Sequence, residues 1–420
     1  MNKHETRADK EPMKHVIFLG AGASKTSGYP LASGLRLRLS SEDQLIADLR
    51  ELTEGTKGVP EDTERLQCRG FFKPFKGTVE QFRRGGFGTI DEFSKLASAK
   101  YPARVQEMKQ LMLLALSLHN PEEKFHNSDY YPFIQRLFDQ YDLHLLKPHV
   151  TVISYNYDCY LEYLLLQAQA YRNKLAEQPE PTVAQKGRIS SGFFQPDDAA
   201  SLASLAGPEP EFRHFKLHGS LTYASDSEHK RLFGASLSDR LQLVHDTKIN
   251  RSAPPVVFPW ELFGDEMQFI RYQEFIFAKQ AKGTDQESQA TILYNLYNSI
   301  WMGAKQAVQR AHKISFVGLS MHPYMLPGLK YLFENKTGEI EVVVANPANS
   351  EHKDNESSRI FHPGSPRQRV AEMFKIVAPH MQLVRSSSEF IRGKRDKRDD
   401  VKFGITGRDS FSDFIEREMD

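Results

Sequence analysis

Two polar side chains, Asn156 and Asp158, follow the apolar run "HVTVIS", and a histidine, His218, follows the run "FRHFKL" further along the chain. With the period of two that holds in extended chain, Asn156 and Asp158 point the same way, so an amide and a carboxylate can face one ligand. An imidazole with an unperturbed pKa near ~6.5 can accept a proton at cellular pH. These three residues therefore have the chemistry to orient a ligand and to activate a nucleophile.

Small and polar residues also end three other apolar runs. "HVIFLG" (15–20) continues into a glycine loop, where Gly20 and Gly22 let the backbone approach a ligand that a Cβ would repel. A helix N-terminus behind this loop would offer free N–H groups to a pyrophosphate. "KISFVGLS" (313–320) ends in Gly318 and Ser320, and "EIEVVVANP" (339–347) ends in Asn346 and a proline.

These five runs, including 149–156 and 212–219, have the apolar, β-leaning composition of buried strands. Helix-like stretches separate them, notably 92–118, 131–144 and 290–312. Strands that alternate with helices predict an α/β fold with a Rossmann-like, doubly wound parallel sheet. Ligands bind such sheets beyond the carboxyl ends of the strands, which is where the polar residues stand.

Each position also has a purely structural explanation. The glycine loop can be a tight turn, since Lys25 stands where the full G-x-G-x-x-G pattern has its third glycine. Asn156 and Asp158 can cap the helix that "CYLEYLLLQ" begins, and His218 can be a core histidine bonded to a carbonyl. Gly318, Ser320 and the Asn346-Pro347 pair can form ordinary turns. The coincidence of all five strand ends favours a site.

Composition limits the classes of function. Of 420 residues, 40% are hydrophobic, and Lys+Arg of 55 against Asp+Glu of 54 leaves a net charge of +1, which gives no electrostatic argument for direct nucleic-acid binding. The apolar runs are too short to span a bilayer, and the charged start lacks a signal-peptide pattern. Cys68 and Cys159 can form neither a disulfide scaffold nor a four-thiolate zinc site. We expect a cytoplasmic protein without membrane contact.

The chain divides into a domain over 1–390 and a charged C-terminal tail over 391–420. Within the domain, a helical insertion at about 40–145 is large enough to form its own lobe. Its exposed-looking stretch "FFKPFKGTVEQFRRGGFG" (71–88) is either a contact surface or a lid. Residues 180–211 and 348–366 are rich in turn formers and predict surface excursions.

The ordered set GAGAS…SGYP, YNYD, LHGS, VGLS and ANP resembles the sirtuin-like (SIR2) superfamily. It is most similar to the bacterial SIR2-like proteins that consume NAD in antiphage defence, and "TIDEF" (89–93) and the helical insertion resemble that branch too. The resemblance implies NAD+ as the substrate, with no metal. It also implies the residues that hold the pyrophosphate of NAD+, namely Gly20, Ala21, Gly22 and Ser24, and it adds Pro30 to the residues that bind NAD+.

By the same resemblance, Asn156 positions the nicotinamide ribose and a water, while Asp158 contacts the carboxamide or orders the loop. His218 is the expected general base. Gly318 and Ser320 match the motif that lines the phosphate and the adenosine ribose, and Asn346 matches the asparagine near the adenine ribose.

Two departures separate this chain from protein-deacylating sirtuins. The four-cysteine zinc module is absent, and Leu31-Ala32-Ser33 replaces their Asp-Phe-Arg, with Arg36 or Arg38 as candidates for the missing arginine. These departures favour an NAD+ glycohydrolase that releases nicotinamide and ADP-ribose and depletes NAD in antiphage defence. The alternatives are a catalytically silent module that binds NAD or ADP-ribose, and a deacylase or ADP-ribosyltransferase.

A toxic NADase must be restrained until infection. By family analogy alone, we expect a homo-oligomer or a separately encoded partner, such as a HerA-like ATPase or a short Argonaute.

Overall fold

The computed structural model describes most of the chain outside its longest loops. The described residues are 13–53, 73–84, 89–117, 128–140, 145–158, 160–177, 212–220, 223–225, 232–234, 256–264, 268–275, 278–279, 281–346, 366–379, 381–384, 401–408 and 410–419. Cys68, Cys159, the proposed excursion at 180–211 and all but the last residue of the one at 348–366 lie outside these ranges.

A seven-stranded sheet in the order β3-β2-β1-β6-β7-β9-β8 forms the centre of the structure, and each of its strand pairs is parallel. The five predicted strands are present and have the order 3-2-1-4-5 among themselves, which confirms the Rossmann-like α/β prediction. Their bounds are β1 His15–Leu19, β2 Val150–Ser154, β3 Arg213–Lys216, β6 Lys313–Val317 and β7 Ile340–Ala345. A separate antiparallel pair joins β4 (Tyr223–Ser225) to β5 (Leu232–Gly234).

The C-terminal segment departs from the sequence prediction. Instead of a charged tail from 391 on, β9 (Val401–Arg408) inserts between β7 and β8 (Met381–Val384), and α17 (Phe411–Glu418) follows it. Helix α17 buries Phe411, Phe414 and Ile415 in the hydrophobic cluster that also contains Ile17 and Leu19 of β1. The sequence does not predict this strand, because Lys402, Gly404 and Gly407 interrupt its apolar pattern and a charge run precedes it. The folded unit therefore continues through residue 418.

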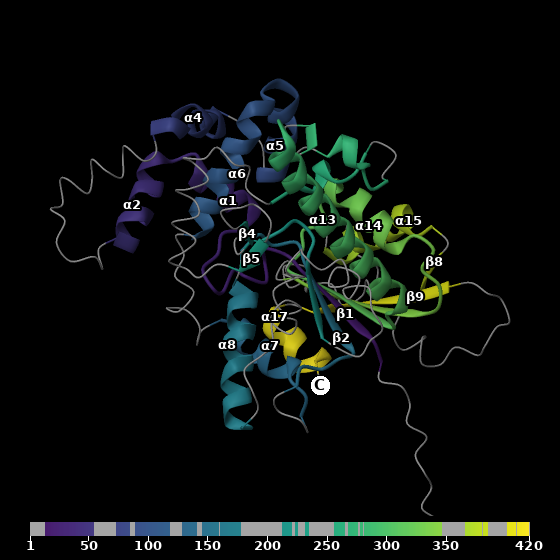
Figure 1. Ribbon diagram of the computed structural model, residues 1–420. Helices are drawn as coiled ribbons and strands as arrows, with labels where there is room; N and C mark the ends of the chain where they lie inside the picture. The colour runs from purple at the N-terminus through teal and green to yellow at the C-terminus, as the bar shows by residue number, and fades with distance from the viewer. Residues whose placement is uncertain are drawn as a thin grey trace, which may run out of the picture.

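Helices cover both faces of the sheet (Figure 1). On one face lie α13 (Thr284–Arg310), α14 (Leu326–Phe333) and α15 (Pro366–Val377), so the predicted helix at 290–312 begins earlier than expected. On the other face lie α7 (Tyr130–Leu137), α8 (Tyr160–Leu175) and α17. Successive side chains of β1 point to opposite faces of the sheet. Val16 and Phe18 belong to the buried cluster on one face, and Ile17 and Leu19 belong to the cluster on the other. Among the described residues, no helix is both long enough and apolar enough to cross a membrane.

The region between β1 and β2 is helical, as predicted. It contains α1 (Ala32–Leu39), α2 (Glu42–Thr53), the short helix η1 (Lys73–Phe75), α4 (Lys76–Arg84), α5 (Ile90–Lys100), α6 (Pro102–Ser117) and α7. The predicted helix at 92–118 is in fact two helices, because Pro102 disfavours helical backbone at Tyr101. The prediction at 131–144 extends past the end of α7, and residues 141–144 of it lie outside the described part.

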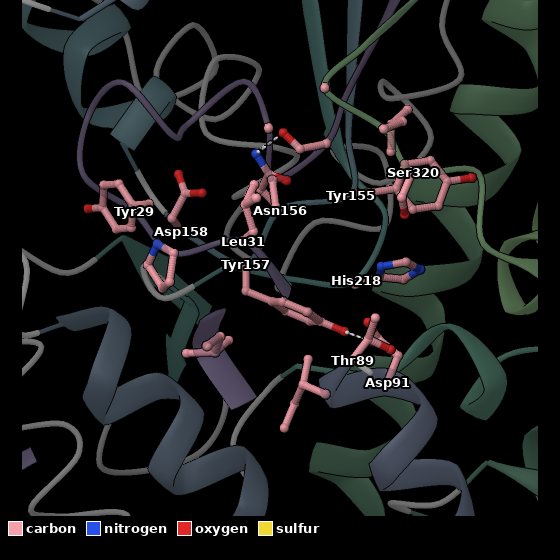
Figure 2. Close-up of a pocket in the computed structure, with 18 of the residues that line it drawn as sticks. Tyr29, Leu31, Thr89, Asp91, Tyr155, Asn156, Tyr157, Asp158, His218 and Ser320 are labelled. Atoms are coloured by element: carbon pink, nitrogen blue, oxygen red, sulfur yellow. Dashed lines mark hydrogen bonds between the residues drawn. The ribbon is translucent and has the colours of Figure 1, made fainter. Parts of the chain in front are cut away.

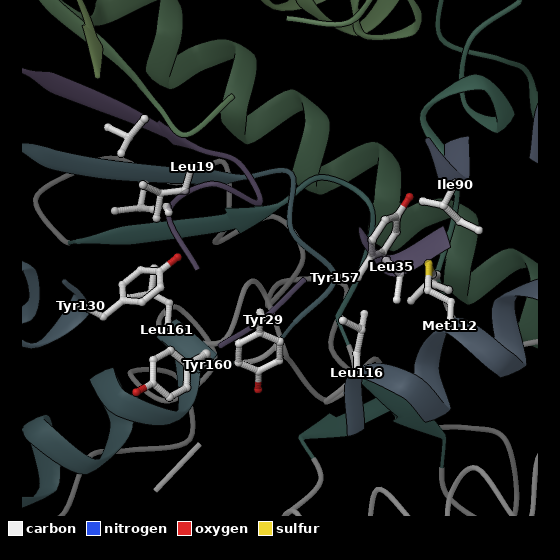
Figure 3. Packing of buried hydrophobic residues seen from close by; sticks show 14 of the residues in the cluster. Leu19, Tyr29, Leu35, Ile90, Met112, Leu116, Tyr130, Tyr157, Tyr160 and Leu161 are labelled. Atoms are coloured by element: carbon white, nitrogen blue, oxygen red, sulfur yellow. The ribbon is translucent and has the colours of Figure 1, made fainter. Parts of the chain in front are cut away.

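The helical insertion is packed against the sheet rather than forming a lobe with its own core. Met112 and Leu116 of α6 and Ile90 of α5 belong to the same buried cluster as Leu19 of β1 (Figure 3). In the exposed-looking stretch 71–88, the described residues 73–84 form an amphipathic element. Its three buried apolar side chains, Phe75, Val79 and Phe82, belong to that cluster.

Three further short helices follow β5 in the chain. They are η3 (Pro259–Glu261), η4 (Tyr272–Glu274) and η5 (Pro323–Met325). A buried ion pair fixes η3 to the insertion, with Lys109 Nζ of α6 lying 2.7 Å from Glu261 Oε2. Burial lowers the pKa of Lys109, and the carboxylate of Glu261 opposes that shift. The insertion is thus anchored beside the carboxyl ends of the strands.

Candidate functional site

A cavity of about 420 Å³ lies beyond the carboxyl ends of β1, β2, β3, β6 and β7 (Figure 2). With the exception of Ser24, every residue predicted for the site lines it. From the sheet loops these are Gly20, Ala21, Gly22, Pro30, Asn156, Asp158, His218, Gly318, Ser320 and Asn346. The structure therefore brings together residues that the sequence separates by more than 300 positions.

Ser24 lies behind the cavity wall and joins the glycine loop to the Asn156–Asp158 pair. Its hydroxyl donates to Asp158 Oδ2 over 3.0 Å and accepts from Asn156 Nδ2 over 3.0 Å. Asn156 Nδ2 also donates to the carbonyl of Gly20 over 3.0 Å. These bonds use both N–H donors of Asn156 to hold the glycine loop, so Ser24 has a positioning role rather than a lining one.

Both carboxylate oxygens and the backbone carbonyl of Asp158 accept hydrogen bonds within the protein. Its Oδ1 accepts the backbone N–H of Tyr160, the first residue of α8, over 3.2 Å, so the helix-capping explanation applies to this residue. Its backbone carbonyl accepts from Lys216 Nζ, which also lies 3.1 Å from Glu162 Oε1. Burial raises the pKa of Asp158, and the charge of Lys216 opposes that shift. The geometry favours loop ordering over carboxamide contact for Asp158.

Gly22, after β1, and Gly318, after β6, must both be glycine because their backbones lie in direct contact. The N–H of Gly22 donates to the carbonyl of Gly318 over 2.9 Å, and a Cβ on Gly22 would lie 2.7 Å from the Gly318 Cα. Gly318 has a φ of +64°, and its Cβ would lie 2.3 Å from the backbone nitrogen of Ala23. The close contact of two loops explains these glycines without a ligand, although both line the cavity.

The glycine loop does not lead directly into a helix. Residues 21–28 form successive turns, in which Ala23, Ser24 and Lys25 donate their N–H groups to the carbonyls three residues earlier. Helix α1 begins only at Ala32. The helix predicted after the loop is therefore present but does not start directly behind it, and most N–H groups of the loop are used internally.

His218 is a buried imidazole that lines the cavity, with a residue exposure of 2%. Its ring packs against Tyr155, Tyr157 and Trp301, with centroids 5.1, 6.0 and 6.2 Å away. Burial lowers the pKa of His218 to about 3, and a hydrogen bond to the Tyr155 backbone raises it by less. Its Nε2 is buried and has no hydrogen-bond partner. The imidazole is thus neutral at cellular pH and presents one unused lone pair.

A second unpartnered polar atom lies near His218. The hydroxyl of Tyr155, another residue that lines the cavity, is buried without a hydrogen bond. Burial raises the pKa of this phenol, so it stays protonated. Because buried polar groups without partners are rare, each of these two atoms indicates a place where a ligand or a water completes the hydrogen bonding.

Sequence reasoning missed a wall of the cavity that comes from the insertion and from η5. Asp91 of α5 lines the cavity, accepts a hydrogen bond from Tyr157 over 3.4 Å and shares another with Tyr324. In the sequence, the "TIDEF" segment that contains Asp91 indicates only the family resemblance. A signal was available, since Thr89 and Glu92 form the capping box that predicts where α5 begins.

Two cationic side chains of the cavity were also missed. Lys25 lines it from the glycine loop, and Arg369 lines it from α15, where Nη1 donates to the Ser320 carbonyl over 3.1 Å. Arg36 and Arg38, the candidates for the absent sirtuin arginine, do not line the cavity, and Arg36 Nη1 donates to the Phe82 carbonyl over 3.4 Å. Lys25 and Arg369 can receive an anionic ligand.

Within the described ranges, no cluster of three or more His, Cys, Asp or Glu side chains has the arrangement of a metal site. Comparison with known proteins found no matching family model and no matching curated protein.

Proposed function

We propose that the protein is an NAD+ glycohydrolase that cleaves the nicotinamide–ribose bond to give nicotinamide and ADP-ribose. The observation that carries this proposal is the buried, unpartnered Nε2 of neutral His218, in one cavity with Asn156 and two cationic side chains. The motif order that resembles SIR2-like proteins supports it independently.

The cavity has the chemical requirements for a dinucleotide. Its volume of about 420 Å³ lies in the range of ~300–1,000 Å³ typical of small-molecule sites. Lys25 and Arg369 supply positive charge for a diphosphate, and Asn346 and Ser320 supply polar groups beside Arg369 for a ribose. Tyr155, Tyr157 and His218 give the other end an aromatic wall where a nicotinamide ring can pack.

In the proposed reaction, the C–N bond to nicotinamide breaks, and the bonding electrons leave with the pyridine nitrogen. Positive charge then develops on the ribose, and water attacks the anomeric carbon. The attacking water becomes a strongly acidic oxonium as its C–O bond forms, so a weak base is sufficient to take the proton. His218, neutral because of its low pKa, accepts that proton at Nε2. Asn156 holds the glycine loop in place beside the reacting ribose.

To test this proposal, the purified full chain is incubated with NAD+, and the released nicotinamide is measured by chromatography. We expect release that His218→Ala and Asn156→Ala abolish. His312→Ala is the matched control, because His312 is exposed and does not line the cavity. Undiminished turnover by the His218→Ala protein would contradict the mechanism.

One observation favours a second function, a silent module that binds NAD or ADP-ribose. Both N–H donors of Asn156 and both carboxylate oxygens of Asp158 already have partners within the protein. A purely binding site needs no more than this ordered loop. Tight binding of NAD+ without nicotinamide release, under every condition and with candidate activators present, would support the binding module over the enzyme.

In the cell, we propose that the activity depletes NAD during phage infection, and that self-assembly or a separately encoded partner restrains it. The exposed Leu37, Leu96 and Tyr101 place apolar side chains on the surface of the helical region between β1 and β2. Size-exclusion chromatography with light scattering, with and without the product of a neighbouring gene, tests this part. A monomer that is fully active alone would refute it.

A further inference from the structure

Asp91 is a carboxylate of the cavity that has no role in the reaction proposed above. It is the second residue of α5 and only 6% exposed, yet it lines the cavity. The capping box of Thr89 and Glu92 fixes the start of this helix: the Thr89 hydroxyl accepts the Glu92 N–H over 3.2 Å, and Glu92 Oε2 accepts the Thr89 N–H over 3.0 Å. Asp91 is therefore held in place by the backbone of the insertion.

The groups that surround the Asp91 carboxylate are neutral or negative. Tyr157, after β2, and Tyr324, on η5, donate hydrogen bonds to it. The negative charge of Glu92, on the same helix, raises the pKa of Asp91. The Glu92 carboxylate itself is paired with His322, with Oε1 lying 2.7 Å from Nε2. Among the described residues, no Lys or Arg forms an ion pair with Asp91. A buried carboxylate without a cation is costly, so this site favours a cationic ligand.

The other acid of the cavity, Asp158, is in a different state. Its two oxygens accept from Ser24 and Tyr160, and Lys216 lies against its backbone carbonyl. Asp158 therefore already has its partners, including a neighbouring cation. Asp91 is the acid whose charge remains to be balanced.

Asp91 lies at the end of the cavity that contains His218. The Tyr157 hydroxyl reaches Asp91, and the Tyr157 ring lies 6.0 Å from the His218 ring, tilted by 32°. Figure 2 shows Asp91 and His218 near the hydroxyl end of Tyr157, with Asp158 towards the opposite side. In the proposed reaction, this is the end that receives the nicotinamide ring, which is a cationic pyridinium in NAD+ and neutral in NADH.

We infer that Asp91 selects the cationic form of the nucleotide, so that the site binds NAD+ in preference to NADH. This inference rests on the proposed function, because it requires a nicotinamide nucleotide in the cavity. The two nucleotides share their ribose, diphosphate and adenosine groups, so a difference in affinity reports the charge of the ring. Asp91 thereby determines specificity, while His218 and Asn156 serve the bond cleavage.

The experiment measures dissociation constants of NAD+, NADH and ADP-ribose by calorimetry, in a His218→Ala background that suppresses hydrolysis. We expect about tenfold tighter binding of NAD+ than of NADH, the scale of one unit of pKa. Asp91→Asn should remove this preference and leave ADP-ribose affinity unchanged. Asp91→Glu should restore part of it, since the charge returns on a longer side chain.

Glu92→Gln is the matched control. It removes one negative charge from the neighbouring position, outside the cavity lining, and glutamine still suits the capping box. This variant should keep the NAD+ preference. Equal NAD+ and NADH affinities with Asp91 present, or a preference that survives Asp91→Asn, would overturn the inference while ADP-ribose binding upholds the nucleotide site. Failure to bind any of the three would overturn the proposed function together with it.

Discussion

Replacement of Asp91 by asparagine should stabilise the folded protein at neutral pH. Burial raises the pKa of Asp91 from 3.8 to about 6, despite the hydrogen bonds from Tyr324 and Tyr157. Between these two values the folded state binds more protons than the unfolded state, so stability decreases as the pH rises through this window. Two pKa units correspond to about 3 kcal/mol of unfolding free energy at pH 7.5. Asparagine has the shape of the protonated acid and avoids this cost.

The expected change in melting temperature follows from chain size. At ~2.1 cal/mol/K per residue, unfolding of a chain of this length has an entropy of about 0.9 kcal/mol/K, so about 3 kcal/mol raises Tm by about 3 °C. Melting curves of wild type and Asp91→Asn, followed by circular dichroism from pH 3.5 to 7.5 without nucleotide, measure this. The curves should coincide at pH 3.5 and separate above pH 5. An Asp91→Asn protein less stable than wild type at pH 7.5, or a difference that does not vary with pH, would refute the reasoning.

Four further predictions concern the cavity walls. The low pKa of His218 makes the folded state bind fewer protons than the unfolded state between pH 6.5 and about 3, so wild type loses stability as the pH falls through this range. His218→Gln should therefore lose less stability on acidification than wild type. Melting curves of both proteins at pH 7 and pH 4 test this, and an equal decrease of Tm in the two proteins would contradict it. Gly318→Ala should cost roughly 3 kcal/mol or more, since its Cβ would lie 2.3 Å from the Ala23 nitrogen at positive φ; urea titration measures this, and a change below about 1 kcal/mol would count against the loop contact. Ser24→Ala should cost about 1–3 kcal/mol and lower nicotinamide release, because it removes the shared partner of Asn156 and Asp158; unchanged turnover would exclude the positioning role. Lys25→Ala should weaken ADP-ribose binding by about tenfold at low salt and by less at high salt, and an effect independent of salt would argue against contact with the diphosphate.

The strand ends were predictable because their signal is local. Each of the five predicted strands is a short apolar run that ends in a small or polar residue, and parallel topology then brings those ends to one edge. The sequence also predicts that Asn156 and Asp158 act together, although the structure shows that they mainly hold the loop and the start of α8. Their roles depend on distances to Ser24 and Tyr160, which a linear pattern does not contain.

The insertion side of the cavity was not predictable in the same way. Asp91 meets Tyr157 and Tyr324 only through the packing of α5 against two loops that are 66 and 233 residues away in sequence. Arg369 likewise reaches Ser320 from a helix outside the motif set. β9 was missed because its glycines and charges obscure the apolar pattern, and its place is decided by pairing with β7. Long-range packing, rather than local preference, determines these features.

The capping box that fixes Asp91 belongs to the helical insertion, whereas the groups assigned to bond cleavage come from the sheet. In the proposed mechanism, bond cleavage and discrimination between the two nucleotides therefore depend on separate stretches of chain. Exchange of the first turn of α5 would change how strongly NADH competes with NAD+ for the site, while the bond that breaks in the proposed reaction remains that of NAD+, because only the pyridinium ring leaves as a neutral molecule. A binding partner that shifts this helix would likewise change how strongly NADH inhibits the proposed reaction.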